Sequence, residues 1–491
     1  MVRVPVMSAN MKFVGVLELA SKYRYGLTSR GVPLYLFKPY DETCPDLIVG
    51  CSIKDITKNQ IAIVVKEDHP HSKSGQKPRG MLLQLLGPVG DIAAERCGLL
   101  EHWCPYKPQT VVVAEEPEAK AKTADCQMLT LETGWTTFHV DPPGCRDIDD
   151  AIAWSSQQQR WAICIADAAS LVPSQSITDQ AARAIGQTFY DMRGRVVRSM
   201  LPPEISENTG SLLPHQEKPA LAAFFSADGS ECLGWALVCI NVAHSFTYEE
   251  FTQAAANSLG LPATHLPVAD SHQWIASWMV RYNIAAAKML KNYGVGLLRH
   301  QSAADANAVA HWQSIHTDLG WMATEAATYK PAGRDDCGHW GLGVAAYTHA
   351  SSPLRRYADL YNQRCLKACL AGQQKDINTD IDTLAEELNL RSRAERKWSR
   401  DLLFLENIKP GKVEICRGIC VDPVERLVWI PVWRRLIRLR HASVDACSPG
   451  DSIEFKIFCD PVRRNWRERI LTAAAATETE AKAVGSVRHF I

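Results

Sequence analysis

The chain has 491 residues, of which 46% are hydrophobic, a composition typical of a folded protein with about two to four domains. Lys plus Arg and Asp plus Glu both number 54, so the formal net charge is zero and the chain is not a bulk polycation. The 16 cysteines form no C-x-x-C pair, there is no apolar stretch of about 18 residues, and the N-terminus lacks a signal-peptide core. We therefore expect reduced thiols, no membrane partner and a cytoplasmic location, with organellar import left open.

The N-terminal part, residues 11–112, contains five short apolar runs separated by Gly, Pro and Asp. The runs are Phe13–Leu17, Pro33–Phe37, Leu47–Ile53, Gln60–Val65 and Met81–Leu86. Short strands at this spacing predict a small β-barrel, and we expect an OB-like fold. Residues 113–127 are rich in Glu, Lys and Ala and predict a linker.

Four aspartates lie within ten residues of the sequence HVDPPGCRDIDDAIAW, which covers residues 139–154: Asp141, Asp147, Asp149 and Asp150. Carboxylates this close repel one another and raise one another's pKa, and a divalent cation offsets that repulsion. Two predicted strands, Thr136–Val140 and Ala151–Trp154, flank a turn that would aim the short side chains at one point. A ligand set made only of oxygens favours Mg2+, with Mn2+ as the second choice.

A solvated acidic turn or a structural Ca2+ site is the alternative for this cluster. The EF-hand calcium loop needs Gly at its sixth position and Glu at its twelfth. With Asp141 as the first position, Arg146 and Ile152 occupy these places, so the EF-hand pattern fails. The solvated turn stays open on the aspartates alone.

A second segment, YTHASSPLRRYAD at residues 347–359, places Arg355 and Arg356 after a Ser-Ser-Pro turn. They stand at the start of a predicted helix that runs to about Leu370. Guanidinium groups and helix N-termini both bind phosphate, so an acidic loop and an arginine pair together favour phosphodiester chemistry. A structural pairing of both arginines with nearby acidic residues is the alternative.

The rest of the central part, residues 128–408, shows helical patterning over Ala254–Asn307 and Ile381–Leu405, which we expect to flank a mixed sheet. Residues 409–472 return to short predicted strands, Lys412–Val421, Leu427–Val432, Leu436–Leu439 and Ser452–Phe458. This part holds 13 Lys and Arg against 8 Asp and Glu. The Ala- and Glu-rich residues 473–491 predict a disordered tail.

The C-terminal part also combines basic and aromatic side chains, among them Trp433, Arg434 and Arg435. Such a combination on a small barrel favours RNA binding. A plain barrel with core tryptophans and solvated arginines is the alternative.

The two central motifs resemble those of the RNase II/RNase R exoribonucleases, which carry the RNB catalytic domain. The aspartate run matches that family's metal motif, and YTHASSPLRRYAD is similar to its YTHFTSPIRRYPD signature. Four further matches lie in order within residues 130–410. They are Ile163–Asp167 (family V-H-I-A-D), Met200–Ser206 (M-L-P-E-E-L-S), Ser245–Glu250 (L-T-Y-E-E) and Gly296–Arg299 (A-L-Y-R).

The resemblance implies an α+β multidomain protein with an N-terminal OB-like, cold-shock-type RNA-binding barrel, a central mixed α/β RNB-type catalytic domain and a C-terminal OB-fold RNA-binding domain. It implies metal-dependent digestion of single-stranded RNA from the 3′ end to nucleoside 5′-monophosphates. The metal set would be Asp141, Asp147, Asp149 and Asp150, with Asp149 at the position that the family needs for cleavage. The other implied residues are Arg355, Arg356 and Glu395 in catalysis, and Tyr190, Tyr248, Arg299, Trp433, Arg434 and Arg435 in RNA binding.

Two departures from the family pattern are present, of which the first predicts weaker feeding of RNA from the N-terminal side and the second removes no predicted metal ligand or phosphate clamp. Only about 110 residues precede the linker, whereas family members usually carry two N-terminal OB domains, and Gln363 replaces the usual His before Arg364. The alternative function is a catalytically weak RNA-binding or scaffold subunit of an RNA-degradation complex. We expect a monomer, with partners in such a complex left open.

Overall fold

The computed structural model describes residues 12–67, 77–108, 127–255, 259–262, 270–334, 336–372, 380–408, 413–439, 447–459 and 470–474. The chain forms two compact units. Unit 1 contains Met1–Pro105, Asp305–Ala323 and Arg396–Ile491, and unit 2 contains Tyr106–Ala304 and Thr324–Glu395. The expected linker lies largely, and the expected tail almost entirely, outside the described residues.

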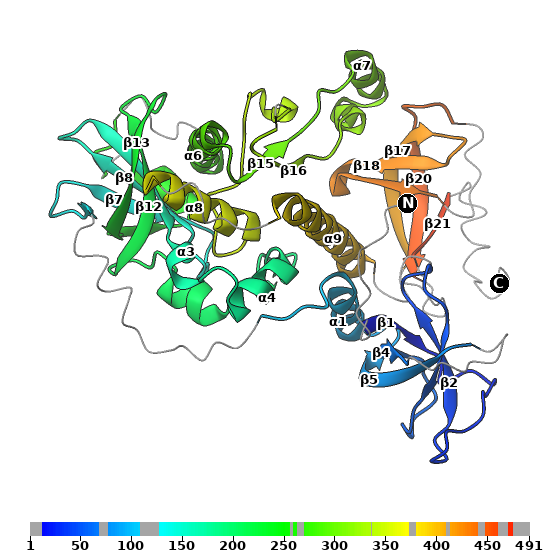
Figure 1. Ribbon diagram of the computed structural model, residues 1–491. Coiled ribbons are helices and arrows are strands. Elements are labelled where there is room, and N and C mark those ends of the chain that lie inside the picture. The colour runs from blue at the N-terminus through cyan, green and yellow to red at the C-terminus, as the bar shows by residue number, and fades with distance from the viewer. Residues whose placement is uncertain are drawn as a thin grey trace. The chain divides into compact units, whose positions relative to one another are not determined.

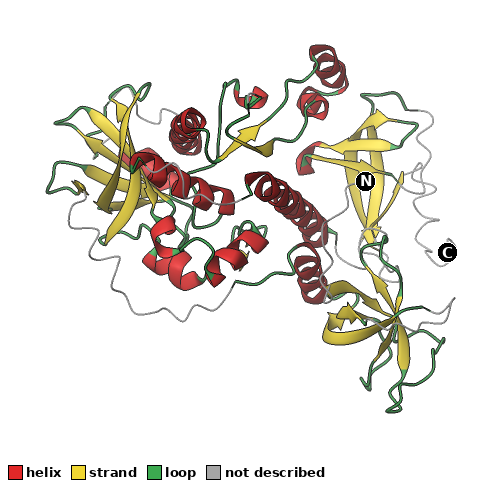
Figure 2. Cartoon of the chain, in the orientation of Figure 1, coloured by secondary structure: helices red, strands yellow, loops and turns green. Residues whose placement is uncertain are grey.

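The N-terminal part of unit 1 is a closed five-stranded barrel with the strand order β1-β2-β3-β5-β4 (Figures 1 and 2). Its strands are β1 (Lys12–Leu17), β2 (Leu34–Pro39), β3 (Leu47–Gly50), β4 (Gln60–Lys66) and β5 (Arg79–Pro88). All five coincide with the predicted apolar runs, because alternate residues of each run point into the barrel core. Helix α1 (Ile92–Trp103) follows, and the Asp91 side chain caps it by accepting a hydrogen bond from the Ala94 amide. An RNA-binding role for this barrel stays a prediction.

The C-terminal part of unit 1 is a five-stranded sheet in the order β19-β18-β17-β20-β21. Its elements are β17 (Val413–Asp422), β18 (Leu427–Ile430), the 3-10 helix η5 (Pro431–Trp433), β19 (Arg435–Arg438), β20 (Ser452–Cys459) and β21 (Ile470–Ala474). Four strands match the predicted runs, and β21 includes the first two residues of the expected tail. Within the described residues no pairing between β19 and β21 closes this sheet into a barrel, so its OB-fold assignment stays a prediction.

A segment from the middle of the chain belongs to unit 1. It comprises helix α7 (Ala306–Ile315) and the 3-10 helix η3 (Thr317–Ala323). Leu319 is fully buried against Val421 and Trp429 of the C-terminal sheet, and Trp312 and Ile315 pack around them. The hydrophobic contacts therefore join residues that the sequence analysis assigned to two successive domains.

Unit 2 is built on a seven-stranded sheet in the order β14-β7-β8-β9-β12-β13-β6. Its strands are β6 (Gln127–Leu129), β7 (Thr136–Val140), β8 (Asp150–Ser155), β9 (Arg160–Ala166), β12 (Glu217–Ser226), β13 (Cys232–Asn241) and β14 (His244–Phe246). The sheet is mixed, because β14 pairs with β7, and β6 with β13, in parallel while the other pairs are antiparallel. The predicted mixed sheet is thus present.

The remaining elements of unit 2 are helices and short strands. They are α3 (Ala168–Leu171), α4 (Ile177–Ile185), β10 (Phe189–Tyr190), β11 (Val196–Arg198), the π-helix η1 (Glu204–Thr209), α5 (Tyr248–Ala255), α6 (Ser271–Tyr293), β15 (Leu297–His300), β16 (Thr328–Pro331), η4 (Trp340–Leu342), α8 (Tyr357–Leu370) and α9 (Ile381–Asn407), which continues into unit 1. Helix α6 packs on the sheet through aromatic rings, with the Trp278 and Trp161 ring centroids 5.0 Å apart. This packing places α6 beside the strands that lead into the aspartate loop.

The predicted helical stretch Ala254–Asn307 was too long. Helix α6 ends at Gly294, which adopts φ +66°, a left-handed conformation that glycine tolerates best. The chain then forms strand β15, whose Arg299 pairs with Tyr329 of β16. The apolar residues Leu297 and Leu298 continued the periodic pattern, but both are fully buried in a strand.

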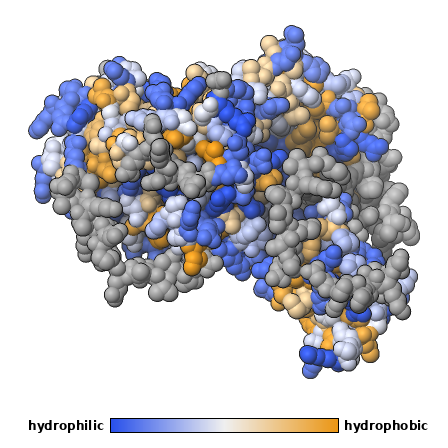
Figure 3. Space-filling model, in the orientation of Figure 1, coloured by the Kyte–Doolittle hydropathy of each residue, from blue (hydrophilic) through white to orange (hydrophobic). Residues whose placement is uncertain are grey.

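No helix among the described residues is long and apolar enough to cross a membrane. On the face drawn in Figure 3, hydrophilic residues are interspersed with smaller hydrophobic patches.

Candidate active site

The aspartate loop connects β7 to β8 and lines a cavity of about 970 Å³ within unit 2. All four aspartates contribute to the cavity wall, and so do Tyr190, Tyr248, Arg355 and Arg356. Residues that are about two hundred positions apart in the chain thus share one site. Helix α6 supplies the apolar part of the wall through Ile275, Met279 and Val280.

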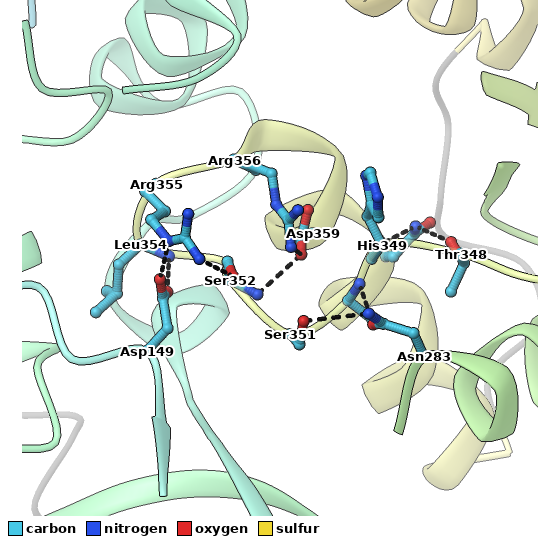
Figure 4. A network of polar contacts seen from close by, with 12 residues as sticks. Asp149, Asn283, Thr348, His349, Ser351, Ser352, Leu354, Arg355, Arg356 and Asp359 are labelled. Carbon is cyan, nitrogen blue, oxygen red and sulfur yellow. Dashed lines mark hydrogen bonds and ion pairs between the residues drawn. The ribbon is translucent and has the colours of Figure 1, made fainter. Parts of the chain in front are cut away.

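Asp149 joins the two signature motifs. Its carboxylate accepts hydrogen bonds from the Leu354 amide at 2.8 Å and from the Arg355 Nε at 2.9 Å (Figure 4). The side chain is buried, and burial raises its pKa to about 7, although the Arg355 guanidinium and the Leu354 amide act in the opposite direction. Both carboxylate oxygens accept hydrogen bonds from the arginine loop, so Asp149 holds that loop beside the acidic loop.

Arg356 is held by a second carboxylate. Its guanidinium forms an ion pair with Asp359 at 2.8 Å, and the same Asp359 oxygen accepts the Ser352 amide at 2.8 Å (Figure 4). Helix α8 begins directly after Arg356, and the Tyr357 amide donates to the Gly186 carbonyl. Phosphate contacts at this end of the cavity would therefore come from side chains more than from that first helix amide.

Asn283 and Asn362 position the rest of the arginine loop. Asn283 of α6 accepts the Ala350 amide and donates to the Ser351 hydroxyl. Asn362 accepts the Leu297 amide and donates to the His349 carbonyl. Both asparagines are buried, so these bonds fix the loop against β15 and α6.

Two of the remaining aspartates have hydrogen-bond partners beside them. His139 Nδ1 lies 2.9 Å from Asp141 Oδ2, and the Tyr190 hydroxyl donates to Asp147 Oδ2 at 2.8 Å. The Cys145 thiol lies 3.5 Å from Asp147 Oδ1, and burial together with the nearby carboxylates raises the pKa of this thiol. Tyr190 therefore lies in the site as the sequence predicts, with its hydroxyl on a predicted metal ligand.

Asp150 carries the least compensated charge of the cluster. No hydrogen bond to its carboxylate is formed within the described part of the chain, and burial together with the neighbouring Asp141 and Asp149 raises its pKa well above the usual value. A hard divalent cation would offset this repulsion, and the oxygen donors suit Mg2+ or Mn2+. Among the described residues, however, no three His, Cys, Asp or Glu side chains converge as a metal-binding group. The donor set fits such a cation, and metal binding at these four aspartates stays a prediction.

Tyr248 forms a stacked pair with His272 at the start of α6, with ring centroids 3.5 Å apart and an interplanar angle of 16°. Burial and the charges of Asp141 and Asp150 raise the pKa of Tyr248 to about 12. Its hydroxyl therefore stays protonated at neutral pH and can donate a hydrogen bond in the cavity.

Other predicted site residues do not line this cavity. The Arg299 guanidinium lies over the Tyr329 ring, 4.7 Å from its centroid, and Glu395 lies on α9. Trp433, Arg434 and Arg435 belong to unit 1, where Trp433 and Arg435 pack on Phe404. Roles for all five in RNA handling remain predictions. Gln363 is buried and binds the Ala169 amide and the Ala166 carbonyl, so the residue that departs from the family pattern has a structural role.

Sequence reasoning missed several residues that contact the predicted ligands or hold the arginine loop, among them His139, Asn283 and Asn362. His139 could have been found, because residues two apart on a strand lie on the same face and His139 precedes Asp141 by two. Asn283 gave no such signal, since an asparagine within a helical pattern does not indicate which loop it binds.

Comparison with known proteins identifies the domain around this cavity. Residues 131–260 and 264–372 match the family model of the RNB domain. The chain carries an RNB domain. This finding confirms the resemblance to the RNase II/RNase R family, and it assigns both signature motifs to that domain.

The curated relatives bear the names of nucleases. The chain is 24% identical over 429 residues to the exosome complex exonuclease RRP44 of Mus musculus, covering 68% of this chain and 44% of the relative. It is 24% identical over 348 residues to ribonuclease R of Helicobacter pylori, covering 54% of this chain and 53% of the relative. The chain thus spans about half the length of these relatives.

Solved structures share the fold of the chain. The apo form of Mycoplasma genitalium RNase R has a TM-score of 0.72 at 15% identity, covering 94% of this chain and 90% of that one. Yeast Ssd1, described as a pseudonuclease, has a TM-score of 0.65 at 17% identity, covering 93% and 68%. The mixed α+β, RNase R-like architecture with β-barrel elements is therefore established, while activity has to be argued from the site.

Proposed function

We propose that this protein is a metal-dependent 3′-to-5′ exoribonuclease that hydrolyses single-stranded RNA to nucleoside 5′-monophosphates. The observation that carries the proposal is the shared cavity, in which Asp149 of the acidic loop binds the Leu354 amide and Arg355 of the arginine signature. The names of the relatives, an exosome complex exonuclease and a ribonuclease R, support the same activity.

The residues divide into those that would hold the phosphate and those that would hold the sugar and base. Arg355 is 41% exposed beside the acidic loop, so its remaining donors can reach a substrate phosphate while Asp149 fixes its Nε. Tyr190 and Tyr248 present rings to the cavity, and a ring can stack on any base, which suits cleavage without sequence preference. A guanidinium fixed by Asp149 and two tyrosines in the cavity wall support the proposal.

Asp141, Asp147 and Asp150 would hold the divalent cation. When bound, such a cation supplies Lewis-acid stabilisation of the phosphate oxygens and lowers the pKa of water. Asp149 keeps Arg355 oriented, and its charge matters because the guanidinium next to it must stay aligned while negative charge develops on the phosphate.

A catalytically weak RNA-binding or scaffold protein is the second candidate, favoured by the fold shared with a pseudonuclease. A scaffold has no need for crowded, buried carboxylates, because burial and then the neighbouring charges raise the pKa of Asp150 and cost folding free energy. The four aspartates together with the engaged Asp149–Arg355 pair therefore support activity.

A time course on 5′-labelled single-stranded RNA tests the two candidates. With Mg2+ we expect conversion to a very short 5′ product, loss of this conversion with EDTA, and no cleavage of a DNA oligomer of the same sequence. Asp149→Asn, which keeps an oxygen for the Leu354 amide, should bind RNA nearly as well as the wild type while cleavage falls by orders of magnitude. Intact RNA that is still bound by the wild type would favour the scaffold.

Three further features are part of this proposal and rest on the sequence. They are a cytoplasmic location, a monomeric state, and association with an RNA-degradation complex.

A further inference from the structure

The cavity of the RNB domain has opposite charges at its floor and at its mouth. The four aspartates line the interior, whereas three arginines that are largely exposed to solvent, Arg146, Arg193 and Arg195, line the same cavity. A polyanion that approaches the aspartates meets these guanidinium groups on the exposed side. The arrangement can offset the repulsion between an RNA chain and the acidic floor.

The three arginines differ in how they are engaged. Arg195 forms an ion pair with Asp191 at 2.6 Å, and Arg146 lies 3.8 Å from Glu207. The Arg193 side chain makes no hydrogen bond or ion pair with the described residues, although its amide is bound. Arg193 is therefore the guanidinium at the mouth with all its donors available.

The hairpin that carries Arg193 is held in a fixed conformation. Asp191 Oδ1 accepts the amides of Arg193 at 2.8 Å and of Arg195 at 3.0 Å, and Asp191 Oδ2 accepts Arg195 Nε at 2.8 Å. Gly194 adopts φ +76°, which closes the turn at low cost only for glycine. Burial raises the pKa of Asp191, but the hydrogen bonds from Arg195 and Arg193 outweigh it and the net shift is downward. The Arg193 side chain is thus presented from an ordered turn between β10 and β11.

Position along the hairpin links Arg193 to the reacting end of the site. Tyr190, at the base of the same hairpin, donates to Asp147 inside the cavity, and Arg193 lies three residues further along. The signature arginines are already engaged, Arg355 by Asp149 and Arg356 by Asp359. Of these three, Arg193 alone makes no ion pair with a described carboxylate.

We propose that Arg193 binds a backbone phosphate of the single-stranded RNA entering the cavity, with Asp191 as the positioning residue that holds its turn. This inference rests on the proposed function for the identity of the substrate. Its chemistry is the recognition of a phosphodiester anion by an unpaired guanidinium.

The test measures RNA binding as a function of salt, in EDTA so that no cleavage occurs. A single-strand phosphate contact contributes about 0.7 to the slope of log K against log salt. Extrapolated from 1 M to 0.1 M salt, one such contact corresponds to about a 5-fold change in affinity. With a 5′-fluorescent oligouridylate and anisotropy as the signal, Arg193→Gln should lose about 0.7 of slope and weaken binding about 5-fold near 0.1 M salt.

The matched control is Arg334→Gln. Arg334 is 61% exposed in the same unit, pairs with the exposed Asp382 and does not line the cavity. This variant should keep the wild-type slope. Asp191→Ala should weaken RNA binding as much as Arg193→Gln does, although Arg193 is still present. Asp191→Asn keeps an acceptor for the amides of Arg193 and Arg195 and should retain most of the RNA affinity.

Steady-state kinetics complete the test. Arg193→Gln should raise KM about 5-fold and leave kcat nearly unchanged, because a contact away from the scissile bond binds ground state and transition state alike. Equal slopes and equal KM for Arg193→Gln and the wild type would overturn the inference. If the wild type binds RNA without cleaving it, the exoribonuclease proposal fails while the salt slope still decides the role of Arg193. If the wild type does not bind RNA, both proposals are wrong.

Discussion

Asp359 is the residue whose loss should most disturb the arginine signature. Its side chain is fully buried, and one oxygen accepts both the Ser352 amide and the Arg356 guanidinium at 2.8 Å. Asp359→Ala would leave the Ser352 amide, on a residue that is only 2% exposed, without its partner, at a cost of about 1–3 kcal/mol. Removing one member of a buried ion pair usually lowers the free energy of unfolding by about 3–5 kcal/mol. The Arg356 side chain is 24% exposed and can be hydrated after Asp359 is removed, so the loss should lie at the lower end of this range. For both lost contacts together we expect the free energy of unfolding to fall by about 3 kcal/mol.

Thermal unfolding followed by circular dichroism measures this loss. At about 2 °C per kcal/mol, the lower value for a domain of 150–250 residues, Asp359→Ala should lower Tm by about 6 °C. Asp359→Asn keeps an oxygen for the Ser352 amide and should lose about half as much. The control Asp382→Ala removes an acidic residue that is 61% exposed and should change stability by less than about 0.5 kcal/mol. A Tm for Asp359→Ala within 1 °C of the control would refute the argument that Asp359 supports the arginine loop.

Three other predictions concern residues outside the arginine loop's ion pairs. His139→Ala removes the side chain that lies beside the Asp141 carboxylate and would orient it. Mn2+ binding, measured by electron paramagnetic resonance titration without RNA, should weaken about 10- to 100-fold. Equal Mn2+ affinity of the variant and the wild type would show that His139 does not orient Asp141. Tyr23 and Tyr25 lie on the loop after β1 and are 79% and 40% exposed. If the barrel binds RNA, each ring should contribute about 1–3 kcal/mol to the binding free energy by stacking on a base. An unchanged Kd for RNA in the double alanine variant would show that this loop does not contact RNA. Burial and the Arg356 charge hold the pKa of His349 in the folded protein well below 6.5, so below pH 6.5 the unfolded chain binds one more proton than the folded chain. The free energy of unfolding should therefore fall by up to about 1.4 kcal/mol per pH unit below pH 6.5. In urea titrations, His349→Gln should make this decrease smaller.

The sequence predicted most of the fold where local pattern decides structure. The five runs of the N-terminal barrel are short and apolar, and each became a strand at nearly the predicted bounds. Helix α8 begins within one residue of the predicted arginine start because the Ser-Ser-Pro turn precedes it. The prediction failed at β15, where two buried leucines fit a helical period equally well and only the pairing with β16 decides between helix and strand.

The candidate site was predictable in its members and not in its contacts. Carboxylate spacing placed four aspartates at one loop, and all four line the cavity. No pattern in the sequence indicates that Asp149 binds the Leu354 amide 205 residues away, because that bond depends on how the sheet and α8 pack. The same holds for Glu395 and Arg299, which match family motifs but do not line the cavity.

The segment Asp305–Ala323 has a consequence for experiments that divide the chain. The polypeptide changes unit at residues 105/106, 304/305, 323/324 and 395/396, so neither unit is a continuous stretch of sequence. Truncation at residue 408 would remove Val421 and Trp429, the residues against which Leu319 is buried, and would leave an apolar surface on the RNB-containing half. Aggregation of the shortened chain would then mimic a loss of RNA affinity, so point substitutions on the C-terminal sheet are the sounder way to separate guidance of RNA from its cleavage.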